Sequence, residues 1–372
     1  MNALIPIQRF IFEAKAWRLI AAVMAAMLVK TGVWWMPNLD HQVEIARTPF
    51  ANPFTEEGSH YLYWTWLGPF IAHLIGATDH WSFFALHLAC SIAFTAVVVR
   101  LLFSRLPDRS ARIALILFAA LPVSATAYYW VGMDSLTLLL MALAVAAIRR
   151  PLLLAPIGLA LGIHHFEQAL FGTVALLVAT VLGRRETDGA DCSPRAALAL
   201  LAGVITGKLA LVALFHAFGT QVNSGRAYWF LAHWRDFRDQ LFFHGQAVLW
   251  SLLGLGWLAA FKYADRGRAA LPFFAGLALL IGTVLLGGDQ TRVFSITAFM
   301  LLAVFWLLNP NLLEGVTEPQ AAGVFLLWLL MPWIWMWAGV PRLSASSYDL
   351  AYVLHKAFGW FQVPANPAEW PF

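Results

Sequence analysis

Residues 196–217 read AALALLAGVITGKLALVALFHA, a run of 22 positions with one charged side chain, Lys208. A helix needs roughly 20 apolar residues to cross the hydrocarbon core of a bilayer. The whole chain has a similar character, because 61% of its 372 residues are hydrophobic and 12% are charged. Soluble domains carry roughly 25% charged residues. The composition therefore excludes soluble globular, disordered, fibrous and disulfide-stapled classes, and it predicts an all-α polytopic membrane protein.

Outward from this run, similar stretches predict about 11 transmembrane helices. The aromatic stretch 61–76, YLYWTWLGPFIAHLIG, contains Gly68 and Pro69 and is predicted to lie on the membrane surface, because Trp and Tyr favour the headgroup level. Two runs, 134–148 and 151–163, are short for a full crossing. The apolar runs are 17–36, 81–103, 112–131, 134–148, 151–163, 167–183, 196–217, 246–262, 270–287, 293–308 and 321–338.

The basic residues predict the orientation. With a cytoplasmic N-terminus, 15 Lys and Arg fall in inner loops and seven in outer loops, as the positive-inside rule requires. The C-terminus then lies outside, and all 11 histidines and 12 of the 20 acidic residues lie toward the outer face. We therefore expect an outward-facing site, and we interpret the basic residues as orientation signals and not as a nucleic-acid surface.

The chain has no internal repeat or polar linker. We expect one transmembrane domain over 1–372, with a main module over about 1–310 and a further helix with an outer amphipathic tail over 321–372. The tail segment 347–361 and the loop 223–244, which includes Arg226, both have the spacing of amphipathic surface helices. An alternative role for that loop is that its Trp and Tyr rings stack on sugars and its Arg side chains meet a lipid phosphate.

The first outer loop begins PNLDHQVE at 37–44. If this segment is helical, Asp40 and Glu44 share one face, because they are one turn apart. A carboxylate here can act as a general base on a sugar hydroxyl. The alternative is that Asp40 is the N-cap of a short helix with solvated neighbours.

Two short turns between predicted helices carry further polar residues. Asp134 opens an apolar run, a position where Asp is a good N-cap. His164, His165 and Glu167 lie between two runs with almost no loop, so they need partners or a hydrated cavity. Adjacent histidines point in different directions and no HExxH spacing is present, so hydrogen bonding to a phosphate or sugar is favoured over metal ligation.

A late tip reads GGDQTR at 287–292. Its glycines let the backbone approach a ligand, and Arg292 begins the next helix, where amide groups favour anions. An Arg at this depth can bind phosphate bidentately; the alternative is an Asp289–Arg292 pair that closes the hairpin. Two cations lie within predicted crossings: Lys30 can extend outward, whereas Lys208 needs a partner in the bundle.

These features together resemble the GT-C superfamily of integral membrane glycosyltransferases. The resemblance rests on an acid early in a long outer loop (Asp40), the aromatic surface segment 61–76, the tight hairpins through Asp134 and 164–167, and the Asp-x-x-Arg tip at 289–292. It spans about 1–310. Many members have two adjacent acids in the first loop, whereas His41 follows Asp40 here, and this chain has no soluble C-terminal domain.

The resemblance implies an inverting transfer from a polyprenyl-phosphate-linked sugar to a glycan, lipid or protein acceptor outside a bacterial plasma (inner) membrane. Asp40, with Glu44 nearby, is then the catalytic base. Arg292 holds the lipid phosphate, helped by His164, His165 or Arg226. The expected substrate-binding residues are Tyr61, Trp64, Asp134, Glu167 and Asp289. The donor sugar-lipid is the expected ligand, membrane lipids are further partners, and a divalent metal is left open.

Two other functions stay open at this point. An oligosaccharide polymerase or ligase on a related scaffold would depend on Arg226, His233, Arg235 and Arg238 rather than on Asp40. A lipid-linked sugar transporter or flippase is disfavoured, because transporters often have repeated halves with broken helices at the midplane, and here the polar residues gather toward one face.

Overall fold

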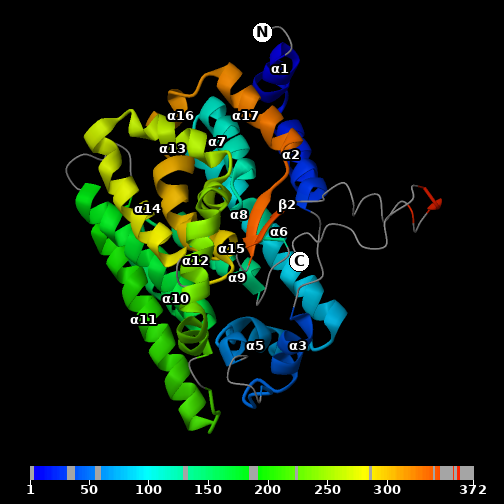
Figure 1. Ribbon diagram of the computed structural model, residues 1–372, viewed down its shortest axis with the longest axis vertical. Helices are drawn as coiled ribbons and strands as arrows, with labels where there is room; N and C mark the ends of the chain where they lie inside the picture. The colour runs from blue at the N-terminus through cyan, green and yellow to red at the C-terminus, as the bar shows by residue number, and fades with distance from the viewer. Residues whose placement is uncertain are drawn as a thin grey trace.

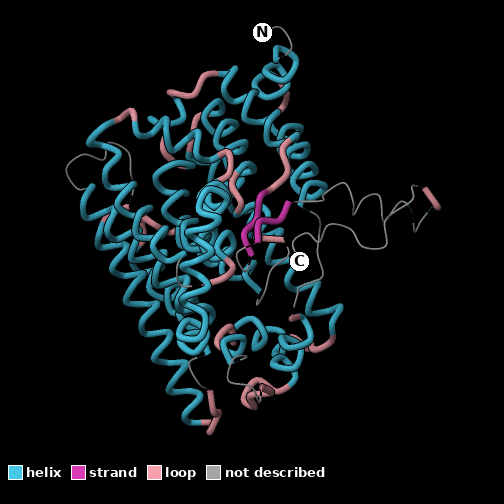
Figure 2. Tube along the Cα trace, viewed as in Figure 1, coloured by secondary structure: helices cyan, strands magenta, loops and turns pink. Residues whose placement is uncertain are grey.

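A computed structural model describes residues 4–31, 38–54, 60–128, 133–183, 192–222, 225–284, 287–337, 340–343, 355 and 358–360. The described chain is almost entirely helical and forms one bundle (Figures 1 and 2). The first helices are α1 (Ile5–Glu13), α2 (Ala16–Thr31), α3 (Leu39–Arg47), α4 (His60–Tyr63), α5 (Leu67–Leu74), α6 (His80–Arg105), α7 (Asp108–Ala120) and α8 (Val123–Thr126). The N-terminus lies at one end of the bundle, and α3 and α5 cover the other end (Figure 1).

The second half of the chain completes the bundle. Its elements are α9 (Asp134–Ala146), α10 (Pro151–Leu182), α11 (Pro194–Ala217), α12 (Gly225–Leu253), α13 (Gly256–Ala264), the 3₁₀ turn η5 (Gly267–Ala270), α14 (Leu271–Thr283), α15 (Gln290–Leu302), the π-helical turn η7 (Ala303–Leu307), α16 (Pro310–Glu314) and α17 (Glu318–Leu330). A hairpin of β1 (Ile334–Trp337) and β2 (Val340–Leu343) follows, pairing Ile334 with Leu343.

Within the described residues, four helices are long and apolar enough to cross a membrane: α6, α10, α11 and the continuous stretch Gln290–Leu307. A fifth is possible if the two helices Phe230–Leu253 and Gly256–Ala264, which meet at 87°, form one broken span. Helices α9, α14 and α17 are apolar but shorter. The protein is therefore helical, with several segments long and apolar enough to span a membrane.

Three of the predicted crossings are interrupted. The run 112–131 breaks after α7 at Leu121 and Pro122, because proline cannot continue the hydrogen bonding of a preceding helical turn. The run 246–262 bends at Gly254, whose φ of 53° is left-handed and suits glycine. The run 321–338 was wrong as a single helix, since α17 ends at Leu330 and 334–337 form β1.

The runs 151–163 and 167–183 are the two arms of α10, joined at His165, whose φ of −150° and ψ of 72° are not helical. Before this residue, Gly158 lies against Gly203 and Gly162 lies against Gly207, so α11 runs parallel to the first arm. After it, Gly172 lies against the backbone of Thr297 in α15. α10 is therefore kinked at His165, and its two arms meet different neighbours.

The segment 61–76 does not cross the bundle, since it forms only the short helices α4 and α5. These helices pack as a layer against the end of α11. Aromatic contacts hold the layer in place: Tyr63 and Trp66 lie against Phe215, with ring centroids 5.0 and 6.1 Å away. The layer lies against the kink of α10, since Gly68 of α5 is next to His164.

The opposite end gathers the basic side chains of the predicted inner loops. Arg105 donates to the carbonyl of Ala146, and Arg109 donates to the carbonyl of Val316. Arg112 donates to the carbonyls of Ile11 and Ala14. These contacts place loops that are far apart in sequence at one end of the molecule, away from α3–α5 (Figure 1).

The two cations predicted within crossings have internal partners. Lys30 does not extend outward: it is buried and donates to the carbonyls of Trp328 and Met331, which α17 leaves unsatisfied at its C-terminal end. The ammonium of Lys208 lies 3.3 Å from the ring centroid of Trp64. A cation over an indole face is a favourable contact, so Lys208 fastens the surface layer to α11.

Candidate functional site

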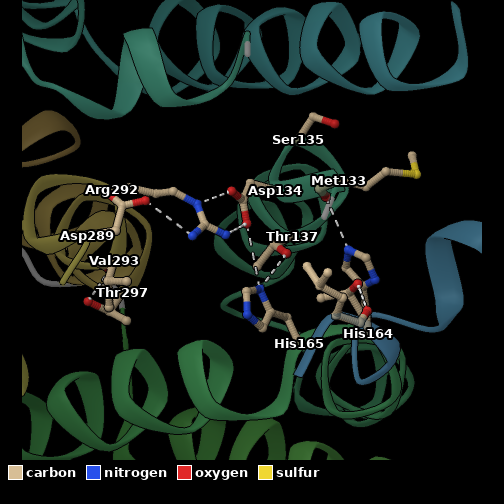
Figure 3. A network of polar contacts seen from close by, with 12 residues as sticks. Met133, Asp134, Ser135, Thr137, His164, His165, Asp289, Arg292, Val293 and Thr297 are labelled. Atoms are coloured by element: carbon tan, nitrogen blue, oxygen red, sulfur yellow. Dashed lines mark hydrogen bonds and ion pairs between the residues drawn. The ribbon is translucent and has the colours of Figure 1, made fainter. Parts of the chain in front are cut away.

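A buried ion pair joins two helices that are far apart in sequence (Figure 3). Arg292, in the first turn of α15, meets both carboxylate oxygens of Asp134, the first residue of α9. Its Nε contacts Oδ2, and its Nη2 donates to Oδ1 over 3.0 Å. Asp134 is fully buried and the Arg292 side chain is 10% exposed. Paired contacts of this kind are the strong form of an Arg–carboxylate interaction.

A second carboxylate lies on the same guanidinium. Asp289 Oδ2 accepts from Arg292 Nη1 over 3.3 Å, and its Oδ1 accepts from the indole Nε1 of Trp335 in β1 over 3.3 Å. Asp289 precedes the spanning helix, and its burial, opposed by the Arg292 charge, raises its pKa to about 7. The sequence expectation of an Asp289–Arg292 contact holds, and Asp134 is an additional partner.

Two histidines from the fold of α10 border this pair. His165 Nδ1 lies 3.7 Å from Asp134 Oδ1 and 3.5 Å from the hydroxyl of Thr137. His164 Nε2 lies 3.1 Å from the main-chain oxygen of Met133. The rings diverge (Figure 3), so His165 faces the Asp134–Arg292 pair and His164 faces the turn before α9. The prediction that adjacent histidines point in different directions is confirmed.

Local backbone geometry explains how α9 presents Asp134. The N-cap position is occupied by Met133, with a left-handed φ of 53°, a conformation uncommon for residues other than glycine. Asp134 therefore enters the first turn of the helix, and its carboxylate points to Arg292 instead of capping α9. The prediction of Asp134 as the N-cap is wrong for this reason.

The predicted base lies on α3, which packs against α5 and extends the surface layer. Residues 39–47 form α3, and Asp40 and Glu44 are both on its exposed face, as expected for a helical segment. Asp40 Oδ1 lies 2.6 Å from Nε2 of His80, with the Asp40 side chain 81% exposed. The other face of α3 packs with Met133 and Leu136, the neighbours of Asp134. Within the described residues, Asp40 and Glu44 do not contact Arg292.

The remaining predicted residues divide between the two places. Tyr61 of α4 lies within electrostatic range of Arg292. The indole ring of Trp64 instead lies against the ammonium group of Lys208. Glu167 lies half-buried just after the fold of α10. Arg226 lies at the start of α12, and its side chain is outside the described residues.

Three further residues were not singled out from the sequence. Trp335 holds Asp289 from β1, Thr137 borders His165 one turn after Asp134, and His80 pairs with Asp40. Thr137 is the only one with a local signal, because its spacing from Asp134 places both on one face of a helix. Trp335 and His80 come from segments remote in sequence, and no spacing rule connects them to their partners.

Within the part of the chain that the structure describes, no three His, Cys, Asp or Glu side chains converge in a way that could hold a metal ion. Comparisons of the chain with protein-family models, with curated proteins and with solved structures find no match. Two polar sites lie toward the α3–α5 end of the bundle: the buried Asp134–Asp289–Arg292–His165 cluster and the exposed Asp40–His80 pair.

Proposed function

We propose that this protein is an inverting glycosyltransferase that moves a sugar from a polyprenyl-phosphate carrier to an acceptor at the outer face of a bacterial inner membrane. One observation supports the proposal: the buried cluster around Arg292 and the exposed Asp40–His80 pair lie toward the same end of the bundle. The two are linked by α3, which exposes Asp40 on one face and packs its other face beside Asp134.

The exposed pair suits general-base chemistry. Asp40 accepts the proton of an acceptor hydroxyl while the hydroxyl oxygen attacks the anomeric carbon of the donor sugar. The new C–O bond forms as the bond from that carbon to the phosphate oxygen breaks, and the phosphate leaves with the electron pair. His80, 2.6 Å from Asp40, orients the carboxylate. Positioned bases of this kind typically contribute about 10²–10⁴-fold to the rate.

The buried cluster suits the phosphate of the carrier. A guanidinium is a planar fork of N–H donors that suits phosphate oxygens as well as carboxylates, and the Arg292 guanidinium already meets the carboxylates of Asp134 and Asp289. Arg292 lies in the first turn of α15, where main-chain amides also favour anions. An ionisable cluster inside a membrane protein is costly unless it has a function, and phosphate binding supplies one.

We further propose the orientation that the charges indicate, with the arginine-rich end in the cytoplasm, the α3–α5 end outside, and the long apolar helices embedded in the bilayer. The carrier lipid then enters from the outer leaflet. In this arrangement the surface layer α3–α5 lies at the headgroup level, where its Trp and Tyr side chains are favoured.

A donor screen with matched variants tests the reaction. Purified protein is mixed with polyprenyl-phosphate sugars and candidate acceptors, and products are identified by mass spectrometry. We expect transfer by the wild type and a loss of at least about 10²-fold in Asp40→Ala, the usual contribution of a general base. The control is Asp236→Ala, because Asp236 also pairs with a histidine, His233, over 3.1 Å on an exposed helix.

The same variants separate the competing functions. Full activity in Asp40→Ala would remove the base assignment. Suppose that transfer activity is lost only in Asp236→Ala and in the alanine variants of Arg226, Arg235 and Arg238. This result would favour an oligosaccharide polymerase or ligase whose site lies on α12. Movement of the lipid-linked sugar across vesicles without any transferred product would indicate a transporter.

A further inference from the structure

Asp289 is the less firmly held of the two carboxylates on Arg292. Asp134 makes two contacts with the guanidinium, whereas Asp289 makes one, at 3.3 Å. The other anchor of Asp289 is the indole of Trp335, also at 3.3 Å. Trp335 belongs to the β1–β2 hairpin and not to the helices that form the pair (Figure 1). Asp289 can therefore leave the guanidinium without breaking the Asp134–Arg292 pair.

Asp289 is one of two carboxylates on a single guanidinium. If Asp289 leaves Arg292 as an ionised group, its carboxylate stays buried without that partner, and a buried charge that loses its partner is costly. Among the described side chains, the titratable groups around Asp289 are Asp134 from α9, Arg292 from α15, His165 from α10 beside Asp134, and Tyr61 from α4 beside Arg292. Burial raises the pKa of Asp289 to about 7, so a proton is readily taken up there.

We propose that Asp289 occupies the phosphate subsite of Arg292 when no ligand is bound, and that a phosphate ester takes its place as Asp289 accepts a proton. The inference rests on the proposed function for the role of Arg292. It adds that the empty site is closed by a carboxylate of the chain itself, and that binding is coupled to uptake of one proton from solvent.

The exchange conserves charge. Before binding, Asp289 supplies the negative charge at this edge of Arg292. After binding, Asp289 is neutral and the single negative charge of a phosphodiester lies at Arg292. No bond other than hydrogen bonds and the new O–H bond of Asp289 changes, and the proton comes from the buffer. The freed edge of the guanidinium then offers the phosphate the donor that Asp289 had used.

Binding of a non-titrating probe tests the exchange directly. Farnesyl methyl phosphate is a lipid phosphodiester with one charge between pH 6 and 9, and its affinity for the detergent-purified protein is measured by calorimetry across that range. We expect the affinity to fall about tenfold per pH unit above pH 7, because each complex must take up a proton. Asp289→Asn should bind with little pH dependence and about a hundredfold tighter than the wild type at pH 9.

Two controls define the result. Asp265→Asn, an exposed carboxylate at the other end of the bundle, should behave like the wild type. Trp335→Phe removes a donor that favours the ionised form of Asp289, so it should shift the midpoint of the pH profile upward while leaving low-pH affinity near the wild-type value. This shift keeps the test decisive if Asp289→Asn does not fold.

The inference is overturned if the probe does not bind, if wild-type affinity is flat from pH 6 to 9, or if Asp289→Asn keeps the wild-type slope. Dimethyl phosphate distinguishes a free phosphate from a lipid headgroup. Equal binding of both probes would support the exchange and count against a lipid donor. Binding with the expected slope but without sugar transfer would likewise retain the exchange and refute the proposed function.

Discussion

At the scale of single residues, we expect the buried Asp134–Arg292 pair to stabilise the α3–α5 end of the bundle. Arg292 faces two buried carboxylates, Asp134 and Asp289, and removing one partner of a buried ion pair leaves an uncompensated charge and typically costs about 3–5 kcal/mol. We therefore expect Arg292→Met to lower thermal stability strongly in detergent. The double variant Asp134→Asn with Arg292→Met should recover part of the loss, because it also removes one of the two carboxylates that lose their partner.

The control for this experiment is Asp265→Ala. Asp265 is 74% exposed and lies 4.0 Å from Lys262, and surface ion pairs contribute about 0–1 kcal/mol. If Arg292→Met were as mild as Asp265→Ala, the buried ion pairs of Arg292 would contribute little to the fold.

Asp289 gives the protein a pH-dependent stability. Its pKa is raised by burial from 3.8 to about 7, so the folded state holds more protons than the unfolded state between these values. Stability from this group is therefore greatest at low pH and is lost as pH rises from about 4 to 7, by at most about 1.4 kcal/mol per unit. The difference in unfolding free energy between wild type and Asp289→Asn should show this slope, and a difference that is constant with pH would contradict it.

The residues of the site could be predicted from the sequence, whereas most of the contacts between them could not. Asp289 and Arg292 are three residues apart, so their contact follows from helical spacing. Asp134 and Arg292 are separated by 158 positions, and nothing local in the sequence connects them. Asp134 also looked like a helix cap, because the left-handed geometry of Met133 that moves it into the first turn leaves no signal in the residue type.

At the scale of elements, glycines set the contact between α10 and α11. A Cβ at Gly162 would meet the backbone of Val204 and Gly207, whereas a Cβ at Gly282 in α14 would meet nothing within 4 Å. We expect Gly162→Ala to destabilise the protein by about 1–3 kcal/mol through overpacking. Gly282→Ala should stabilise it by about 0.4–1 kcal/mol through loss of unfolded-state freedom.

Thermal unfolding of the two variants side by side provides the check. They carry the same chemical change, so opposite signs isolate the effect of helix contact. If both variants were stabilised, the close approach of α10 and α11 would not be a constraint on the fold.

The elements themselves were predictable to different degrees. Hydropathy located the long helices α6 and α11, because each is one uninterrupted apolar run. It did not separate the strand 334–337 from a helix, since periodicity cannot distinguish short apolar runs. It also could not give the bend at Gly254, because an isolated glycine is tolerated in a helix and only packing decides its conformation.

At the scale of the whole molecule, the arginine-rich end and the α3–α5 end should face opposite sides of the membrane. With Cys90 and Cys192 replaced, we expect Asp236→Cys to react with a membrane-impermeant maleimide added to intact cells. Asp265→Cys should react only after permeabilisation. Both positions are exposed, so reactivity reports sidedness rather than burial, and the reverse pattern would invert the proposed orientation.

Transfer of a sugar from a polyprenyl-phosphate carrier is tested most directly by mass spectrometry of the products of a donor screen. We expect the wild type to release the polyprenyl phosphate and to form a glycosylated acceptor of inverted anomeric configuration, and we expect Asp40→Ala to do neither while Asp236→Ala does both. A product formed equally by Asp40→Ala, or no product from any polyprenyl-phosphate sugar, would contradict this expectation.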